Sequence, residues 1–395
     1  MNFGLNETQQ HVKDAAREFF SKELPMAEVR RLIDTDAGYE PGLWKKVAEQ
    51  GYTGMIFPEA YDGVGLGPVE MAAVLEEMGR ALVPGPFVST VLLAGTLLDR
   101  AGSDEQKKKY LAPICRGEIR ATLALLERSA SWDPAAVRMD AKAVGDCFEL
   151  TGEKLFVGDA AVADFIIVVA RGPIGDRVIL IVPSTSPGLT VTPTPGVDLT
   201  RPLYRVSFDR VKVSAGDVLA KGDRAAAALA RALDVVAAGL SAEMVGGMQQ
   251  LLDLTVSYAK TRTQFGRAIG SFQAVQHRCV DLFALVEGAR SAAYYAAWTL
   301  GPGNVAEADA RLAVSVAKAY ASDAFREAGN SAIQVQGGMG FTWENDAHLY
   351  YRRAKGSELL CGDATFHRNR IGSDLTLDAA IGVAPSTPRD RIADR

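Results

Sequence analysis

The sequence predicts an α+β fold in which helical and β-rich segments occupy separate parts of the chain. Three observations support this prediction. Apolar residues recur at three-to-four spacing from residue 7 to about residue 111. Residues 121–220 hold short runs rich in β-branched and aromatic residues, separated by clusters of Gly, Pro, Asp and Ser. After residue 222, long alanine-rich stretches again follow the helical spacing. The order helix, sheet, helix predicts three domains.

Each part divides further at glycine and proline. In the first part we expect helices at residues 10–20, 40–50, 67–81 and 88–101. In the middle part we expect strands at residues 165–170, 178–182, 189–192 and 204–208. The predicted domains span residues 1–118, 119–222 and 223–375. Residues 376–395 lack apolar periodicity and are predicted to form a flexible tail.

Bulk properties argue against several classes of protein. The chain has 395 residues and 48% hydrophobic content, enough for two or three domains with their own cores. Its net charge of −5 argues against binding to nucleic acid or to an anionic membrane. The first residues lack the pattern of a signal or transit peptide, and no uncharged apolar run reaches membrane-spanning length. We expect a cytoplasmic protein.

The cysteines and histidines show no spacing typical of a metal site. Cys115, Cys147, Cys279 and Cys361 lie far apart, without a Cys-x-x-Cys pair, and the four histidines do not cluster. Neither a metal site nor a disulfide framework is therefore expected.

The first informative motif joins two predicted helices in the last part of the chain. It runs from Arg262 through Gln264-Phe265-Gly266 and continues to Phe272-Gln273. Glycine permits a sharp turn there, and the guanidinium of Arg262 is suited to binding a pyrophosphate through paired hydrogen bonds. Taken alone, an arginine at the end of a helix is also typical of a solvated residue favoured by the helix dipole.

The second motif runs from Gln334 to Gly340 and contains the pair Gly337-Gly338. Without Cβ atoms, these glycines let a ligand approach the backbone. A lone glycine pair is equally typical of a helix end. Its distance from the first motif, about 70 residues, makes the combination specific.

Together and in this order, the two motifs resemble the flavin-binding signatures of the acyl-CoA dehydrogenase family. The resemblance implies an N-terminal helical domain, a middle β domain and a C-terminal four-helix bundle, usually in dimers or tetramers. It implies FAD as cofactor, an acyl-CoA substrate and an electron-transfer flavoprotein as acceptor. In the family, residues matching Arg262, Phe265 and Gln273 contact FAD across a subunit interface. Those matching Gln334, Gly337 and Gly338 lie near its adenosine and pyrophosphate half.

The residues expected beside the flavin ring depart from the family pattern. Where relatives carry Trp-Ile-Thr-Asn, this chain reads Phe156-Val157-Gly158-Asp159. Phe156 takes the position of the shielding aromatic residue, while Gly158 removes a hydroxyl donor. The loss of one neutral hydrogen bond costs about 0.5–1.5 kcal/mol, so we expect FAD binding to be weakened and not abolished.

Both usual positions of the catalytic base lack a carboxylate. Desaturation needs a base for the α-proton while the β-hydrogen leaves as hydride, but these positions hold Cys361 and Val236. Glu243 should lie on the same helix face as Val236, about 10 Å along the axis. Its neighbours in the sequence are apolar, and such surroundings raise the pKa of a carboxyl group. Asp363 is the second candidate and Asp159 the third. The alternative is that Glu243 is a paired or rim-exposed residue of the bundle.

The substrate end of the site is less defined. The phosphates of coenzyme A need local cations, which Arg352, Arg353 and Lys355, or Arg128 and Arg138, are able to supply. Small residues in the helix that carries Glu243 leave room for a bulky acyl group, or they serve close helix packing. They are Gly239, Ser241, Ala242, Gly246 and Gly247.

Three functions remain open at this stage. The first is an FAD-dependent acyl-CoA dehydrogenase that produces a trans-2-enoyl-CoA from a fatty or steroid-like acyl group and acts as a homo-oligomer. The second is a catalytically silent or half-site subunit of an α2β2 hetero-oligomer with a paralogous chain. The third keeps fold and flavin but acts as an oxidase or monooxygenase.

Overall fold

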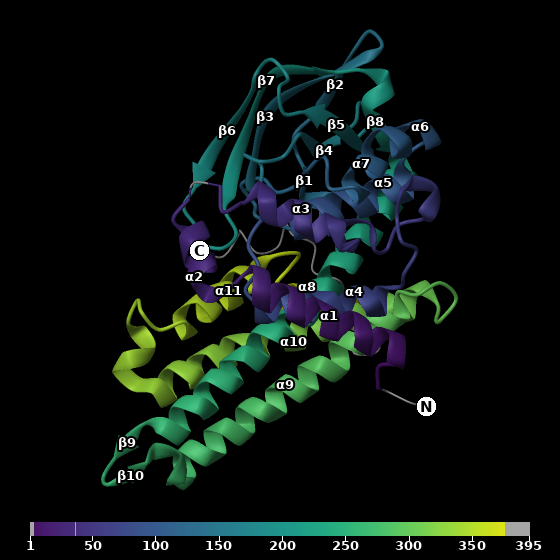
Figure 1. Ribbon diagram of the computed structural model, residues 1–395. Helices are drawn as coiled ribbons and strands as arrows, with labels where there is room; N and C mark the ends of the chain where they lie inside the picture. Colours follow the sequence, from purple (N-terminus) through teal and green to yellow (C-terminus); the bar gives the residue numbers. More distant parts are fainter. Residues whose placement is uncertain (1–3, 36, 376–395) are drawn as a thin grey trace, which may run out of the picture.

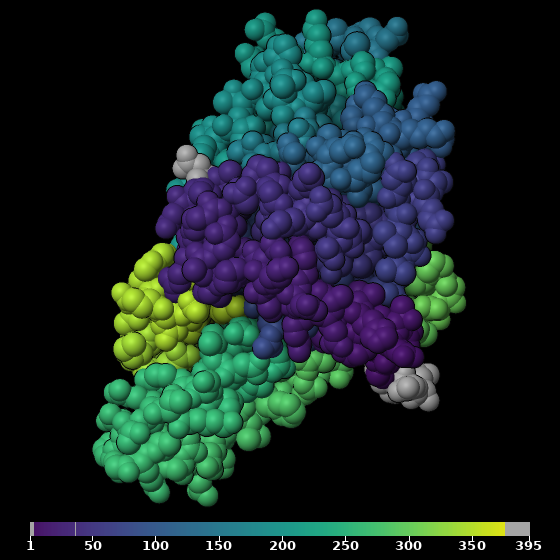
Figure 2. Space-filling view, in the orientation of Figure 1, coloured from purple at the N-terminus to yellow at the C-terminus, as the bar shows by residue number. Residues whose placement is uncertain are grey.

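The computed structural model describes residues 4–35 and 37–375, and it shows three parts arranged along one long axis (Figure 1). A β domain lies at one end and a helical bundle at the other. Figure 2 shows the helices of the amino-terminal part, in purple, between them. The predicted α+β fold, with helix, sheet and helix in this order, is confirmed. The predicted tail, residues 376–395, lies outside the described residues.

The amino-terminal part is helical throughout. Its main helices are α1 (Glu7–Glu23), α2 (Met26–Ile33), α3 (Pro41–Glu49), α4 (Pro68–Arg80), the π-helical η3 (Val88–Gly95), α5 (Thr96–Ala101), α6 (Asp104–Gln106) and α7 (Ala112–Cys115). A capping box starts α1, because Asn6 and Gln9 each accept the backbone N–H of the other, at 3.0 and 2.8 Å. The middle of this part, α4, packs on α1 and on the first helix of the bundle, α8 (Gly222–Thr261).

Glycines allow α4 to cross closely over α8. A Cβ at Gly79 would lie 1.9 Å from the carbonyl oxygen of Glu243. A Cβ at Gly246 would lie 1.7 Å from the carbonyl oxygen of Glu76. Both glycines are therefore required by the helix crossing. The small residues on α8 were expected either to leave room for an acyl group or to allow close helix packing. For Gly246, close helix packing is the explanation.

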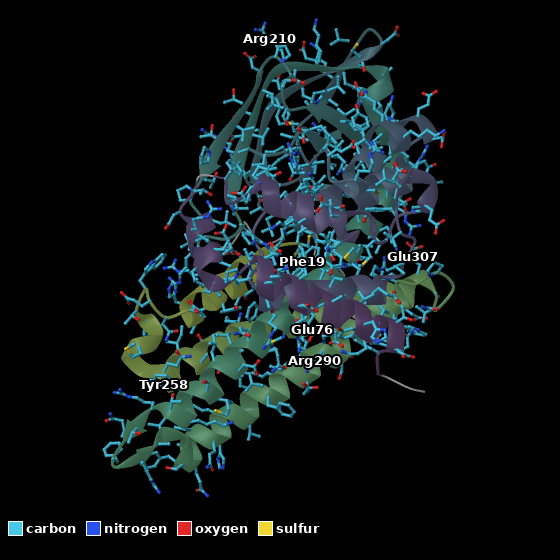
Figure 3. The ribbon with its side chains drawn as sticks, viewed as in Figure 1. Phe19, Glu76, Arg210, Tyr258, Arg290 and Glu307 are labelled. Atoms are coloured by element: carbon cyan, nitrogen blue, oxygen red, sulfur yellow. The ribbon has the colours of Figure 1, made fainter. Side chains whose placement is uncertain are left out.

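A charged network joins α1 and α4 to α9 (Gln273–Thr299). The buried carboxylate of Glu76 accepts from Lys13 Nζ at 2.6 Å and from Tyr294 Oη at 2.7 Å, and it lies 3.3 Å from Nε of Arg290. Figure 3 shows Glu76 and Arg290 at this junction. Burial acts to raise the pKa of Glu76, but Lys13 and Arg290 outweigh it and hold the pKa below its ordinary value. Glu76 is thus an ionised residue of the domain interface.

The middle domain is a pair of four-stranded sheets packed face to face, with orders β1-β4-β5-β8 and β2-β3-β7-β6. The pairing of β1 with β4 is parallel, and the other pairings within these two sheets are antiparallel. The strands are β1 (Ala121–Ala124), β2 (Ala141–Val144), β3 (Cys147–Gly158), β4 (Phe165–Arg171), β5 (Arg177–Pro183), β6 (Leu189–Thr194), β7 (Leu203–Val213) and β8 (Val218–Lys221). Alternate residues of both sheets, such as Leu150, Val168 and Val206, fill the core between them.

The bundle is built on three long helices, α8, α9 and α10 (Glu307–Gln336), which pack on one another. The shorter α11 (Ala347–Leu359) and α12 (Ala364–Asp374) pack against α10. By length and composition alone α8 could cross a membrane. However, 72% of its most apolar window is buried inside the protein, so α8 is a core helix of the bundle.

Candidate functional site

The first motif forms a short hairpin that protrudes from the far end of the bundle (Figure 1). Its strands are β9 (Thr263–Gln264) and β10 (Arg267–Ala268), which follow the end of α8. Phe265 and Gly266 form the turn, with φ of 52° and 79°. Residues other than glycine rarely adopt that backbone conformation. The side chain of Phe265 is also 91% exposed. The strained turn therefore presents the aromatic ring of Phe265 to the surroundings of the chain, where it is available for a contact.

Arg262 and Gln273 lie on either side of this hairpin, and both are exposed. Among the residues that the structure describes, no carboxylate lies within 4.0 Å of the Arg262 guanidinium. An unpaired guanidinium at this position is free to bind a phosphate group. The arrangement therefore fits the role that the resemblance implies for Arg262.

The second motif is the turn that ends α10. Gly337 has φ of 60° and starts the short helix η8 (Gly337–Phe341). A Cβ added at Gly337 or Gly338 would meet nothing within 4 Å, so the space beside this backbone is open. Gln334 is exposed, whereas the buried Gln336 accepts from Asn345 Nδ2 at 2.6 Å. The turn thus presents backbone and the Gln334 amide to a ligand.

Phe156 lies in the middle domain, at an irregularity of β3 where its pairing with β7 shifts register. It has φ of 54° and remains 41% exposed. Two residues on, a Cβ at Gly158 would also meet nothing within 4 Å. In Figure 1 the hairpin and β3 lie at opposite ends of the molecule. The resemblance implies that the hairpin contacts FAD across a subunit interface, and the separation of these two elements agrees with contacts from two chains.

Positive φ is concentrated at the predicted site positions. The described residues include eight non-glycine residues with positive φ. Four of them are predicted site positions, namely Phe156, Asp159, Phe265 and Cys361. Strain of this kind persists where surrounding contacts enforce it, and it clusters at functional sites.

The two usual base positions are buried and lack a carboxylate. Cys361 is 3% exposed, and its carbonyl oxygen lies 3.0 Å from Nε2 of His367. Burial raises the pKa of Cys361 to about 12, although the nearby Lys318 opposes the change. The thiol therefore stays protonated at neutral pH. Val236 is fully buried on α8.

The expectation that Glu243 lies in apolar surroundings is wrong. Its Oε1 accepts from Arg353 Nη1 and its Oε2 accepts from Arg201 Nη2. Both partners come from segments distant in sequence, so the apolar neighbours in the chain gave no sign of them. Both carboxylate oxygens of Glu243 are bound by guanidinium groups. Glu243 is therefore a paired residue of the bundle, which was the alternative to a catalytic role.

The arginine partners extend this pair into a network between all three domains. Arg353 Nη2 donates to the Val83 carbonyl at 3.0 Å and to Thr200 Oγ1 at 2.6 Å, and its Nε lies 3.0 Å from Asp198 Oδ2. Arg201 Nη1 donates to Ser357 Oγ at 2.9 Å. The side chain of Arg353 is only 1% exposed. It is therefore unsuited to contacting coenzyme A, one of the roles suggested for it from the sequence.

The other two candidate carboxylates also have structural contacts. Asp363 is the N-cap of α12 and accepts the N–H of Phe366 at 2.7 Å, a role that helix starts commonly require. Asp159 accepts from Ser89 Oγ at 2.6 Å through Oδ2. Its Oδ1 has no partner among the described residues. Burial raises the pKa of Asp159 to about 6.

These features satisfy what FAD requires of the two signatures. Arg262 offers an unpaired guanidinium for the pyrophosphate, and Gly337-Gly338 offers a backbone that a ligand can approach. Phe156 offers a partly exposed aromatic ring in the middle domain. The hydroxyl donor that relatives place at the position of Gly158 is absent.

Family models match nearly the whole chain. They are the acyl-CoA dehydrogenase N-terminal domain at residues 6–118, the middle domain at residues 122–211 and the C-terminal domain at residues 226–376. The 3-(aryl)acrylate reductase of Clostridium sporogenes is 31% identical over 379 residues, which cover 93% of this chain and 99% of that protein. The acyl-CoA dehydrogenase IpdE2 of Mycobacterium tuberculosis is 31% identical over 370 residues, which cover 93% and 98%.

Solved structures give the same result. A chain in the crystal structure of the ChsE4-ChsE5 complex from Mycobacterium tuberculosis is 29% identical, with a TM-score of 0.85 over 95% of this chain and 99% of that one. The fold and the exposed signatures thus define a flavin-dependent oxidoreductase of the helix–sheet–helix class. The chain belongs to the acyl-CoA dehydrogenase family, and its cofactor is FAD.

Proposed function

We propose that the chain takes part in the α,β-desaturation of an acyl-CoA thioester to a trans-2-enoyl-CoA, as one subunit of an α2β2 hetero-oligomer. The catalytic carboxylate then comes from a paralogous subunit. One observation carries the proposal. The residues of the two motifs that we expect to contact FAD are all exposed, whereas the two expected base positions hold a protonated thiol, Cys361, and an aliphatic side chain, Val236.

The contacts of the remaining candidate carboxylates support a catalytic base on the partner subunit. A general base needs an oxygen within hydrogen-bond reach of the proton that it removes. Both oxygens of Glu243 are occupied by arginines, and Asp363 caps a helix. The resemblance to a chain of the two-protein ChsE4-ChsE5 complex also favours assembly with a paralogue.

In this function, the chain's own residues bind and orient. Arg262, Phe265 and Gln273 would contact FAD across a subunit interface. Gln334, Gly337 and Gly338 would hold its adenosine and pyrophosphate half. Phe156 covers the ring in the middle domain. FAD, when bound, accepts the hydride that leaves the β-carbon of the substrate. An electron-transfer flavoprotein is the expected acceptor, and reoxidation by air in place of an artificial acceptor would favour the oxidase alternative.

A second candidate is a self-sufficient dehydrogenase in which Asp159 is the base. It is favoured by the unpartnered Oδ1 of Asp159 and by a pKa raised to about 6, close to the value that suits a general base at neutral pH. Asp159→Asn separates the two candidates. It abolishes turnover by the chain alone if Asp159 is the base, and it leaves the turnover of a hetero-oligomer unchanged if the base belongs to the partner.

Replacement of Arg262 tests the cofactor contact. Arg262→Ala should weaken FAD binding by about 10- to 100-fold, because hydrogen bonds to a charged group contribute about 1.5–3 kcal/mol. The measurement is a titration of the flavin-free assembly with FAD, followed by flavin fluorescence. The matched control is Arg210→Ala, since the Arg210 side chain is 75% exposed on β7 and, among the described residues, pairs with the exposed Asp209 at 3.3 Å. An unchanged affinity in Arg262→Ala would remove this residue from the FAD site.

A further inference from the structure

An apolar cavity lies between the amino-terminal helices and the first half of α8. Its volume is about 260 Å³. Aliphatic side chains from α4, η3, α8 and the end of α9 form much of the wall. They include Met71, Leu75, Leu92, Val235 and Leu300. Such a lining is typical of sites for small molecules.

The mouth of this cavity is basic. Arg100, Arg231, Leu300 and Pro302 line both the cavity and an adjoining open cleft of about 440 Å³. Arg224 and Glu307 lie further out in the cleft. Figure 3 shows Glu307 at the side of the molecule, at the connection between α9 and α10, and far from Arg210 at the end of the β domain. A ligand that fills the cavity therefore leaves it past two arginines.

Two arginines of the cleft, Arg231 and Arg224, lack a close carboxylate partner among the described residues, and each donates to a backbone carbonyl. Arg231 Nη2 donates to the Leu300 carbonyl at 2.5 Å and Arg224 Nη2 to the Ala101 carbonyl at 2.7 Å. Among the described residues, neither guanidinium has a carboxylate within 4.0 Å. Arg100 Nε lies 3.6 Å from Asp99, which is also 3.6 Å from Lys107 Nζ. The charge at the mouth is thus only partly neutralised.

Mutual repulsion of the guanidiniums adds to this imbalance. Burial lowers the pKa of Arg231, and the positive charge of Arg100 lowers it further, while the more weakly acting Asp234 and Glu307 oppose the change. A partly buried charge beside a like charge is costly unless an anion neutralises both. A carboxylate suits the position, because it accepts short hydrogen bonds from guanidinium groups.

We propose that this cavity binds an apolar chain that ends in a carboxylate, with the chain against α4, η3 and α8 and the carboxylate between Arg100 and Arg231. The proposal does not depend on the desaturation reaction. Two sources supply this chemistry. One is a free carboxylic acid. The other is the far end of a dicarboxylic acyl-CoA, which presents the same apolar chain and terminal carboxylate.

Calorimetric titration of the purified native assembly with decanoate tests the proposal. Decanoate should bind at least ten times more tightly than its uncharged match, methyl decanoate. Arg231→Ala and Arg100→Ala should each weaken decanoate binding by about 10- to 100-fold. Arg210→Ala should leave it unchanged. The side chain of Arg100 is half exposed, so its variant gives a result even where Arg231→Ala fails to fold.

Competition then identifies the source. Displacement of decanoate by decanedioyl-CoA but not by decanoyl-CoA would support the far end of a substrate as the ligand. Displacement by neither thioester would support a free acid. Equal binding of methyl decanoate, or unchanged decanoate binding in both cavity variants, would overturn the proposal.

Discussion

Cys361→Glu should give the FAD-loaded chain a rate of flavin reduction by acyl-CoA at least about 100-fold above that of the unchanged chain, because general-base catalysis contributes about 10²–10⁴. We expect Cys361 to occupy the position where many relatives carry the base, and its thiol stays protonated. A glutamate there restores the missing group. The measurement is the anaerobic loss of oxidised-flavin absorbance with a series of saturated acyl-CoA thioesters.

Two controls make this result specific. Cys361→Gln fills the same space without an ionisable group and should remain inactive. Val236→Glu places the carboxylate at the second family position and replaces the first variant if the buried site at Cys361 does not accept the larger side chain. Rapid flavin reduction by the unchanged chain would contradict the account, because the base would then be present already.

Glu243→Gln should lower the free energy of unfolding by about 3–5 kcal/mol, the usual effect of removing one partner of a buried ion pair. The carboxylate joins Arg201 from the middle domain and Arg353 from the bundle, and Arg353 also reaches the Val83 carbonyl of the amino-terminal part. A neutral amide leaves both guanidiniums without their counter-charge. Denaturant unfolding measures the change.

Glu18→Gln is the matched control, since Glu18 is an exposed residue of α1 and should change stability little. Measuring stability and turnover together separates a structural role of Glu243 from a catalytic one. If Glu243→Gln kept full stability while turnover fell by orders of magnitude, Glu243 would be the base after all, and the proposed partner subunit would lose its main support.

The sequence predicted the order of domains because local periodicity reports on it directly. The four expected strands correspond to β4, β5, β6 and β7. The long strand β3 was not predicted, since Gly152 and two register shifts interrupt the alternation that marks a strand. Residues 88–101 are helical as expected, but their first half is the π-helix η3.

In the candidate site, too, features set by neighbouring residues were predictable and features set by distant contacts were not. The hairpin at Arg262 and the turn at Gly337 depend on neighbouring residues, so their residue types predict their geometry. The environment of Glu243 depends on contacts across domains, from Arg201 and Arg353. No local pattern reports such pairs. The arginine-lined cavity likewise combines segments far apart in the chain, and only the fold brings them together.

The most direct test of the central claim is the subunit composition of the complex purified through a tag on this chain from its native cells. Native mass spectrometry and flavin content give the answer together. The account predicts equal amounts of this chain and of a second acyl-CoA dehydrogenase chain that carries glutamate at the position of Cys361 or Val236. Copies of this chain alone, each with one FAD and with acyl-CoA turnover, would contradict it.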